Sequence, residues 1–175
     1  AIYSLEKESI PRWNKFLQGY YDNSGIVSDS FDQAVKFGTE GEASLTEDMK
    51  DKGIRLDTSV ETSIFYMGFN MLDKVVGGNQ ENTLEKTRAR KLRQAISIAI
   101  NWEEFISIFL NGRGQVAQGI LPPGIYGYRD GKRGINRYVY DWVQNQPKRK
   151  SIEDAKRLMN EAGYPDGINP KTGAP

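Results

Sequence analysis

The chain has 175 residues, of which 24 are basic and 23 acidic, so its formal net charge is +1. This balance predicts no overall attraction to nucleic acid or to an anionic membrane. The chain contains no Cys and no His, which excludes disulfides, thiolate catalysis, Cys-ligated zinc and every catalytic triad built on these residues. We therefore expect no catalytic residue, no metal site and no cofactor.

A chain of this length can bury one sizeable core, so residues 1–175 are expected to form a single domain. No apolar run approaches the roughly 20 residues that span a bilayer. The first residues also lack the basic and apolar regions of a signal peptide.

The first sixty residues predict short elements. A helix should begin at Ser9 and end near Gly19, with Trp13 on its inner face. A strand at residues 26–27 and a helix over residues 28–37 should follow. Ser44 to Glu47 has the pattern of a capping box, so a second helix is expected there, ended by Gly53. Residues 54–61 alternate imperfectly and predict a bent strand.

Residues 63–69 are rich in aromatic and branched side chains and carry no charge, which predicts a strand buried on both faces. Residues 75–83 read as an exposed linker. Residues 87–100 then predict an amphipathic helix, because their apolar residues recur at three- and four-residue spacing. These residues are Leu92, Ala95, Ile96, Ala99 and Ile100.

A second helix is expected after Asn101, a suitable N-cap, with Gly112 as its stop. The loop of residues 119–124 contains Pro122 and Pro123, which fix two φ angles and preform a backbone edge. Residues 138–143 predict a short turn or half-helix, and residues 144–150 a charged connector. Ser151 should cap the last helix. The predicted core contains Leu92, Ile96, Ile100, Phe105, Phe109 and Leu158.

Three motifs occur in a distinctive order. Residues 66–70 read Tyr-x-Gly-Phe-Asn, and residues 90–101 read Arg-x-Leu-Arg-Gln-Ala-Ile-x-x-Ala-Ile-Asn, followed by the Pro-Pro-Gly loop. Residues 151–167 then form a helix and an Ala-Gly-Tyr-Pro-Asp-Gly exit turn. In this order the motifs resemble the family 5 extracellular solute-binding proteins, which are receptors of ABC importers for peptides, dipeptides and nickel. The chain resembles an excised piece of such a receptor.

The resemblance implies an α/β fold, a mixed sheet with flanking helices that forms part of one lobe of a two-lobed (type II) periplasmic-binding-protein fold. It implies capture of a peptide-like solute in a cleft between lobes, with hinge closure, and delivery to the membrane permease of an ABC importer. A monomer in the periplasm or another extracytoplasmic location is expected, and a membrane anchor in the full-length parent is compatible with the resemblance. A single lobe should hold only half of the site and bind short peptides weakly.

The candidate ligand-binding residues follow the apolar strand or belong to the preformed loop. Asn70 lies at the carboxyl end of that strand, where ligands of open α/β sheets bind, and the loop should return beside it. Each residue also has a structural alternative as a turn or surface group. The candidates are Tyr66, Asn70, Gln118, Gly119, Pro122, Pro123 and Tyr126.

Two other functions are open at this point. The receptor fold is also compatible with a regulatory or enzymatic domain that does not take part in transport. Basic residues of the long helix, together with those of the loop after it, could bind nucleic acid, but acidic neighbours and the lack of interleaved aromatics favour a solvated face. The basic residues are Arg88, Arg90, Lys91, Arg93, Arg129, Lys132, Arg133 and Arg137.

Overall fold

The computed structural model describes residues 2–37, 43–79, 81–170 and 172–173. The chain forms two compact units, one of residues 1–59 and 107–113 and the other of residues 60–106 and 114–175. Each unit has a core of its own. The prediction of a single domain over residues 1–175 stays a prediction, and the two units are described separately below.

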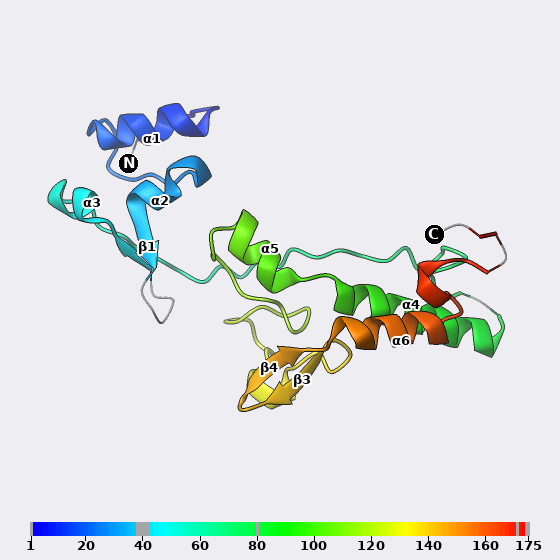
Figure 1. The fold of residues 1–175 in the computed structure, drawn as a ribbon. Coiled ribbons are helices and arrows are strands. Elements are labelled where there is room, and N and C mark those ends of the chain that lie inside the picture. Colours follow the sequence, from blue (N-terminus) through cyan, green and yellow to red (C-terminus); the bar gives the residue numbers. More distant parts are fainter. Residues whose placement is uncertain (1, 38–42, 80, 171, 174–175) are drawn as a thin grey trace. The chain divides into compact units, whose positions relative to one another are not determined.

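The first unit is built from short elements (Figure 1), which surround a hydrophobic core. Trp13, Phe31 and Met49 are almost fully buried in this core, at 3%, 5% and 4% exposure. Its elements are α1 (Ser9–Leu17), the 3-10 helix η1 (Ser28–Ser30), α2 (Phe31–Ala34), β1 (Val35–Phe37), β2 (Ala43–Leu45) and α3 (Glu47–Asp51).

Several predictions for this unit were wrong in detail. β1 and β2 pair in an antiparallel sheet, with Val35 opposite Leu45, where helix had been expected at both positions. Val35 and Leu45 are both buried, so pairing these two β-compatible residues over the core outweighs the local capping signal of Ser44. Residues 26–27 and 54–61 form no strand, although Gly53 ends α3 with a φ of +71° as expected.

The second unit is organised around two helices, α4 (Thr83–Ala99) and α6 (Ile152–Glu161), which pack side by side (Figure 1). The pair is antiparallel, because Ile98 near the end of α4 contacts Ala155 near the start of α6, while Lys91 reaches Glu161 at 2.7 Å. The remaining elements are α5 (Trp102–Phe109), whose last turn is assigned to the first unit, η2 (Gly131–Arg133), β3 (Tyr140–Val143), β4 (Gln146–Arg149) and η3 (Pro165–Gly167).

The apolar stripe of α4 differs in part from the predicted one. Leu92 and Ala95 are buried as expected, but the third position is Ile98, with 0% exposure, and Ala99 faces solvent. The stripe therefore follows three-residue steps from Ala89 to Ile98. Alanine and larger apolar residues alternate in this stripe, and Ala155 is the buried residue of α6.

Two other core predictions were wrong. Phe105 and Phe109 of α5 are 42% and 64% exposed, so neither ring belongs to a buried core. Residues 63–69 form no strand and Phe65 is 94% exposed. A strand needs a neighbour with which its N–H and C=O groups can pair, and no described segment pairs with this one.

A hairpin replaces the predicted turn and connector at residues 138–150. β3 pairs with β4 through the two-residue turn of Gln144 and Asn145, whose φ angles are +49° and +62°. The next helix, α6, begins as predicted, with a complete capping box between Ser151 and Asp154. With helices and two small antiparallel sheets, the α/β class is confirmed. Among the described residues no helix is both long and apolar enough to cross a membrane.

Truncation of Ile98 tests the new register of α4. Ile98→Ala should lower the free energy of unfolding by about 2–5 kcal/mol, because it removes a fully buried side chain from the contacts with Val139 and Ala155. Ile108→Ala is the matched control, since Ile108 is 60% exposed. Chemical denaturation measures both values. Equal effects of the two substitutions would contradict the register.

The capping box predicts a specific pH dependence. Hydrogen bonds from Arg157, then from Ser151, lower the pKa of Asp154 below its ordinary value of 3.8. The carboxylate therefore stabilises the fold above pH 3.8, and this contribution is lost as the pH falls through the lower folded-state pKa. Asp154→Asn should lower the melting temperature at neutral pH, and its difference from the parent should shrink once the pH falls below about 4. Glu153→Gln serves as the charge-matched control. If the difference in melting temperature between Asp154→Asn and the parent were independent of pH, the stabilising role of the Asp154 carboxylate would be contradicted.

Candidate functional site

The loop with the two prolines is a series of tight turns. The Ile125 N–H donates to the Pro122 carbonyl at 3.3 Å, and the Tyr128 N–H donates to the Ile125 carbonyl at 3.0 Å. Gly124 has a φ of +83°, a left-handed conformation that favours glycine. The loop is therefore held by its own backbone as well as by the ring constraints of Pro122 and Pro123, which are both partly buried.

One residue of this loop, Gly124, lies near Thr62, four residues before Tyr66. A methyl group added to Gly124 would be 3.9 Å from Thr62 Cγ2, which is ordinary contact distance. Tyr66 and Tyr126 are 83% and 101% exposed, so both rings are available to a ligand. The predicted return was to Asn70, eight residues further along the chain, so this contact does not test it.

Gln118 has a structural partner. Its side-chain oxygen accepts a hydrogen bond from the Asn136 N–H at 3.1 Å, and Asn136 in turn accepts from the N–H groups of Val139 and Tyr140. Gln118 thus ties the base of the loop to the start of β3. Gly119, the next residue, is exposed.

Asn70 belongs to a second, separate turn. Its side-chain oxygen accepts from the Leu72 N–H at 3.0 Å, so the amide caps the turn that follows it. Asp73 accepts from the N–H groups of Val76 and Val75, and these hydrogen bonds lower the pKa of the Asp73 carboxyl. Of the two roles considered for Asn70, its side-chain oxygen serves the neighbouring turn.

Arg93 fixes this turn to helix α4. Its Nη1 donates to the carbonyls of Val76 and Gly77 at 2.5 and 2.8 Å. Gly77 is buried, and a methyl group added there would be 2.2 Å from the Asp73 carbonyl oxygen. The sequence predicted Arg93 on a solvated face and residues 75–83 in an exposed linker. In the structure, Arg93 instead binds the carbonyls of Val76 and Gly77 in the turn that follows Asn70.

The candidate residues therefore fall into two groups. Tyr66, Gln118, Gly119, the two prolines and Tyr126 belong to the loop and the extended segment beside it, whereas Asn70 belongs to the turn held by Arg93. Thr62, Asn136 and Arg93 were missed. Their contacts join residues at least 16 positions apart in sequence, and no local pattern signals them.

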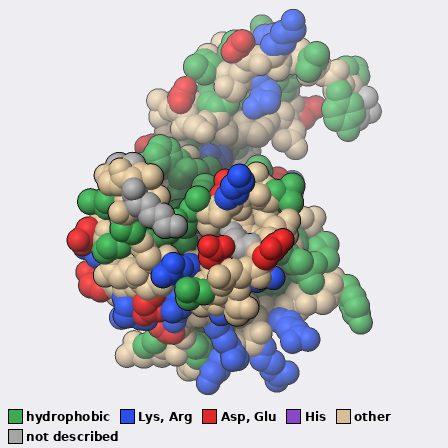
Figure 2. Space-filling view, turned by 90° about the vertical axis from the view of Figure 1, so that its right-hand side faces the viewer, with side chains coloured by type: hydrophobic (Ala, Val, Ile, Leu, Met, Phe, Trp, Pro, Cys, Tyr) green, Lys and Arg blue, Asp and Glu red, His purple; other side chains and the backbone are tan. Residues whose placement is uncertain are grey.

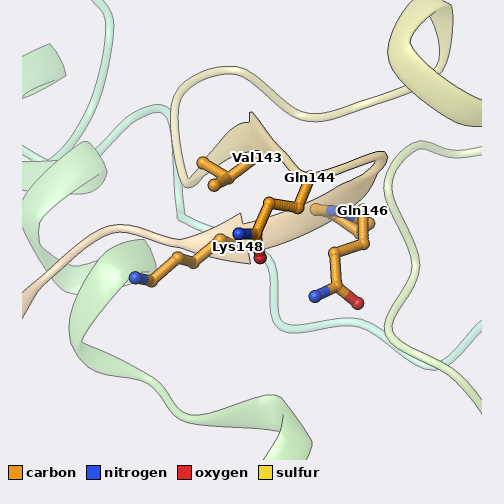
Figure 3. Close-up of a pocket in the computed structure, with 5 residues that line it drawn as sticks. Val143, Gln144, Gln146 and Lys148 are labelled. Carbon is orange, nitrogen blue, oxygen red and sulfur yellow. The ribbon is translucent and has the colours of Figure 1, made fainter.

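Two shallow hollows lie elsewhere in the second unit. One is lined by Arg129, Asp130 and Arg133. The other lies at the tip of the hairpin and is lined by residues of β3, β4 and the turn between them (Figure 3). Neither includes a candidate ligand-binding residue. Across the described residues, no group of three Asp, Glu, His or Cys side chains could hold a metal ion.

Comparison with known proteins identifies the family. Residues 11–172 match the family described as bacterial extracellular solute-binding proteins, family 5 Middle. The chain is 28% identical over 127 residues to the dipeptide-binding protein of Escherichia coli (strain K12), an alignment that covers 73% of this chain and 19% of that protein. It is 38% identical over 78 residues to heme-binding protein A of Haemophilus influenzae (strain ATCC 51907 / DSM 11121 / KW20 / Rd), covering 45% of this chain and 12% of that protein. No solved structure matches.

The chain belongs to family 5 of the bacterial extracellular solute-binding proteins. It spans less than one fifth of the length of the two relatives. Its helices and small sheets agree with part of one α/β lobe of such a protein. Members of this family bind solutes and are not enzymes, which removes the enzymatic alternative.

The role of Arg93 in holding the Asn70 turn can be tested directly. Arg93→Lys should loosen the turn, because an ammonium on a flexible stem does not replace a guanidinium nitrogen that bridges two carbonyls. Hydrogen exchange at the Gly77 and Gly78 amides should accelerate several-fold. A tenfold acceleration corresponds to a loss of about 1.4 kcal/mol in the free energy of local opening. Arg90→Lys, on an exposed position of the same helix, should leave these amides unchanged. Unchanged exchange in Arg93→Lys would refute this role.

Proposed function

We propose that this chain is part of the solute-binding subunit of an ABC importer and captures a peptide-like solute. The observation that carries the proposal is the match to one solute-binding family over residues 11–172, supported by a dipeptide-binding relative aligned to 73% of the chain. The subunit acts outside the cytoplasm as a monomer and hands its ligand to the membrane permease. The ligand is held in a cleft between two lobes.

The loop of residues 119–124 and the extended segment beside it form this chain's share of the binding surface. Three features support this choice: the backbone is preformed by two prolines and internal turns, Gly124 of the loop lies near Thr62, and the rings of Tyr66 and Tyr126 are exposed. A preformed edge binds an extended peptide with little loss of conformational entropy. Tyrosine rings offer apolar surface together with a hydrogen-bonding hydroxyl.

Titration with dipeptides tests the proposal even where affinity is in the millimolar range. Amide chemical shifts of an isotope-labelled chain should move at residues 64–66 and 118–126. Replacing Pro122 and Pro123 by Gly should raise the dissociation constant about 3- to 10-fold, because the unbound loop gains conformational freedom. The melting temperature should change little. Pro170→Gly is the control for proline loss outside the loop. Shifts confined to other residues, or equal affinities in all three proteins, would remove the loop from the site.

Heme is a second candidate ligand, favoured by the 38% identity to heme-binding protein A. Because the chain has no His and no Cys, an axial ligand from this chain would have to be a Tyr or Met side chain. Titration with hemin separates the two ligands. A shifted Soret band that Tyr126→Phe abolishes would favour heme, whereas an unchanged hemin spectrum together with dipeptide-induced shifts favours a peptide.

A further inference from the structure

The near-zero net charge conceals a strong separation of charge along the chain. Residues 125–150 carry seven basic and two acidic side chains, a net charge of +5. The rest of the chain carries 17 basic and 21 acidic residues, a net charge of −4. Residues 125–150, which lie between α5 and α6, therefore form a cationic segment in a chain whose other residues are anionic on balance.

Five of these cations form what we call the basic patch. Each is exposed, and none forms an ion pair with the described residues. The other two basic residues of the segment are used internally, Arg149 with Glu103 and Lys150 with Asp141. The basic patch consists of Arg129, Lys132, Arg133, Arg137 and Lys148.

The fold holds these side chains on a compact scaffold. The Gly134 N–H donates to the Gly131 carbonyl at 3.0 Å, and a methyl group added to Gly134 would be 1.8 Å from the Arg129 carbonyl oxygen. This turn therefore closes so tightly that Arg129 and Arg133 line one hollow. Asp130 also lines the hollow, and its carboxylate accepts the Gly131 N–H at 2.7 Å.

The turn packs against one face of the hairpin: a methyl group added to Gly131 would be 3.8 Å from the Trp142 ring, and η2 contacts β4. Lys148 lies opposite Asp141 on the other face of the hairpin, where it is exposed. Figure 2 shows Lys and Arg side chains gathered along the lower edge of the molecule, the level at which the hairpin lies in Figure 1. Tyr138 and Val143, near these cations in sequence, are 67% and 39% exposed.

We propose that the basic patch docks the protein onto an anionic phospholipid membrane surface, with its arginines and lysines on the lipid phosphates. Arginine matches the geometry of phosphate oxygens, and exposed aromatic residues beside cations are typical of membrane interfaces. The anionic remainder of the chain is repelled by the same surface, so attraction is confined to the patch. The choice of lipid over nucleic acid rests on the proposed extracytoplasmic function.

The test measures co-sedimentation of the 175-residue chain with vesicles. The chain should bind vesicles of phosphatidylglycerol and phosphatidylcholine in equal parts and should not bind pure phosphatidylcholine. Binding should be lost when salt is raised from about 0.05 to about 0.5 M, because the shorter Debye length screens the patch. A duplex oligonucleotide is tested under the same conditions.

Charge-removing variants locate the contact. Lys132→Gln with Arg133→Gln should reduce the vesicle partition about 30-fold, as expected for two cations near the lipid surface. Arg129→Gln with Arg137→Gln should act similarly. Lys86→Gln with Arg90→Gln removes the same charge from exposed positions of α4 and should leave the partition unchanged. Circular dichroism confirms that all variants are folded.

Three results would overturn the proposal: equal binding to both kinds of vesicle, equal losses in the patch and α4 variants, or binding to the oligonucleotide without binding to anionic vesicles. None of them bears on dipeptide binding. If anionic vesicles bind but no dipeptide shifts the loop amides, the membrane surface stands and the proposed ligand fails.

Discussion

The hydrogen bond between Arg149 and the carbonyl of Ile98 holds the second unit together. Arg149 Nη1 donates to the Ile98 carbonyl at 2.9 Å, near the end of α4, where carbonyls lack intrahelical partners. Arg149 Nε lies 3.4 Å from the Glu103 carboxylate at the start of α5. A cation at this end also complements the helix dipole. One side chain of β4 therefore joins two helices to the hairpin.

The apolar contacts around this bond depend on the same geometry. Ile98 is fully buried against Val139, Tyr140 and Ala155, so the hairpin and the start of α6 close over the last turn of α4. Burial, and then the neighbouring Glu103 carboxylate, raise the pKa of the Tyr140 phenol, which stays neutral at every physiological pH. The buried residues Ile98, Val139, Tyr140 and Ala155 at this junction are therefore all uncharged at physiological pH.

The sequence predicts best what is decided locally. The capping box of Ser151 and Asp154 lies within one helical turn, and the extent of α6 follows from it. The hairpin was missed because its turn is Gln-Asn rather than a glycine-containing pair, although asparagine tolerates the positive φ that such a turn requires. The predicted strand at residues 63–69 failed for a different reason: composition shows that a segment suits burial but does not supply a partner strand.

The candidate site shows the same division. The rigidity of the loop could be inferred from Pro122 and Pro123, whereas the contact with Thr62 could not. The return beside Asn70 that the order of elements suggested stays a prediction. Of the basic residues on α4, Lys91 pairs with Glu161 and Arg93 binds backbone carbonyls, so part of the predicted basic face is used inside the fold. The position of a basic residue in the sequence does not reveal whether its side chain is bound within the fold or is available to a ligand.

The antiparallel packing of α4 and α6 has a consequence for how the chain folds. The two helices are separated by residues 100–151, so their contacts can form only after a long loop has closed, at an entropic cost. The β3–β4 hairpin needs only a two-residue turn, and once formed it places Arg149 and the start of α6 on one rigid piece. Early hairpin formation shortens the loop that remains to be closed, and the folding rate of the helix pair is thereby tied to a turn that neither helix contains.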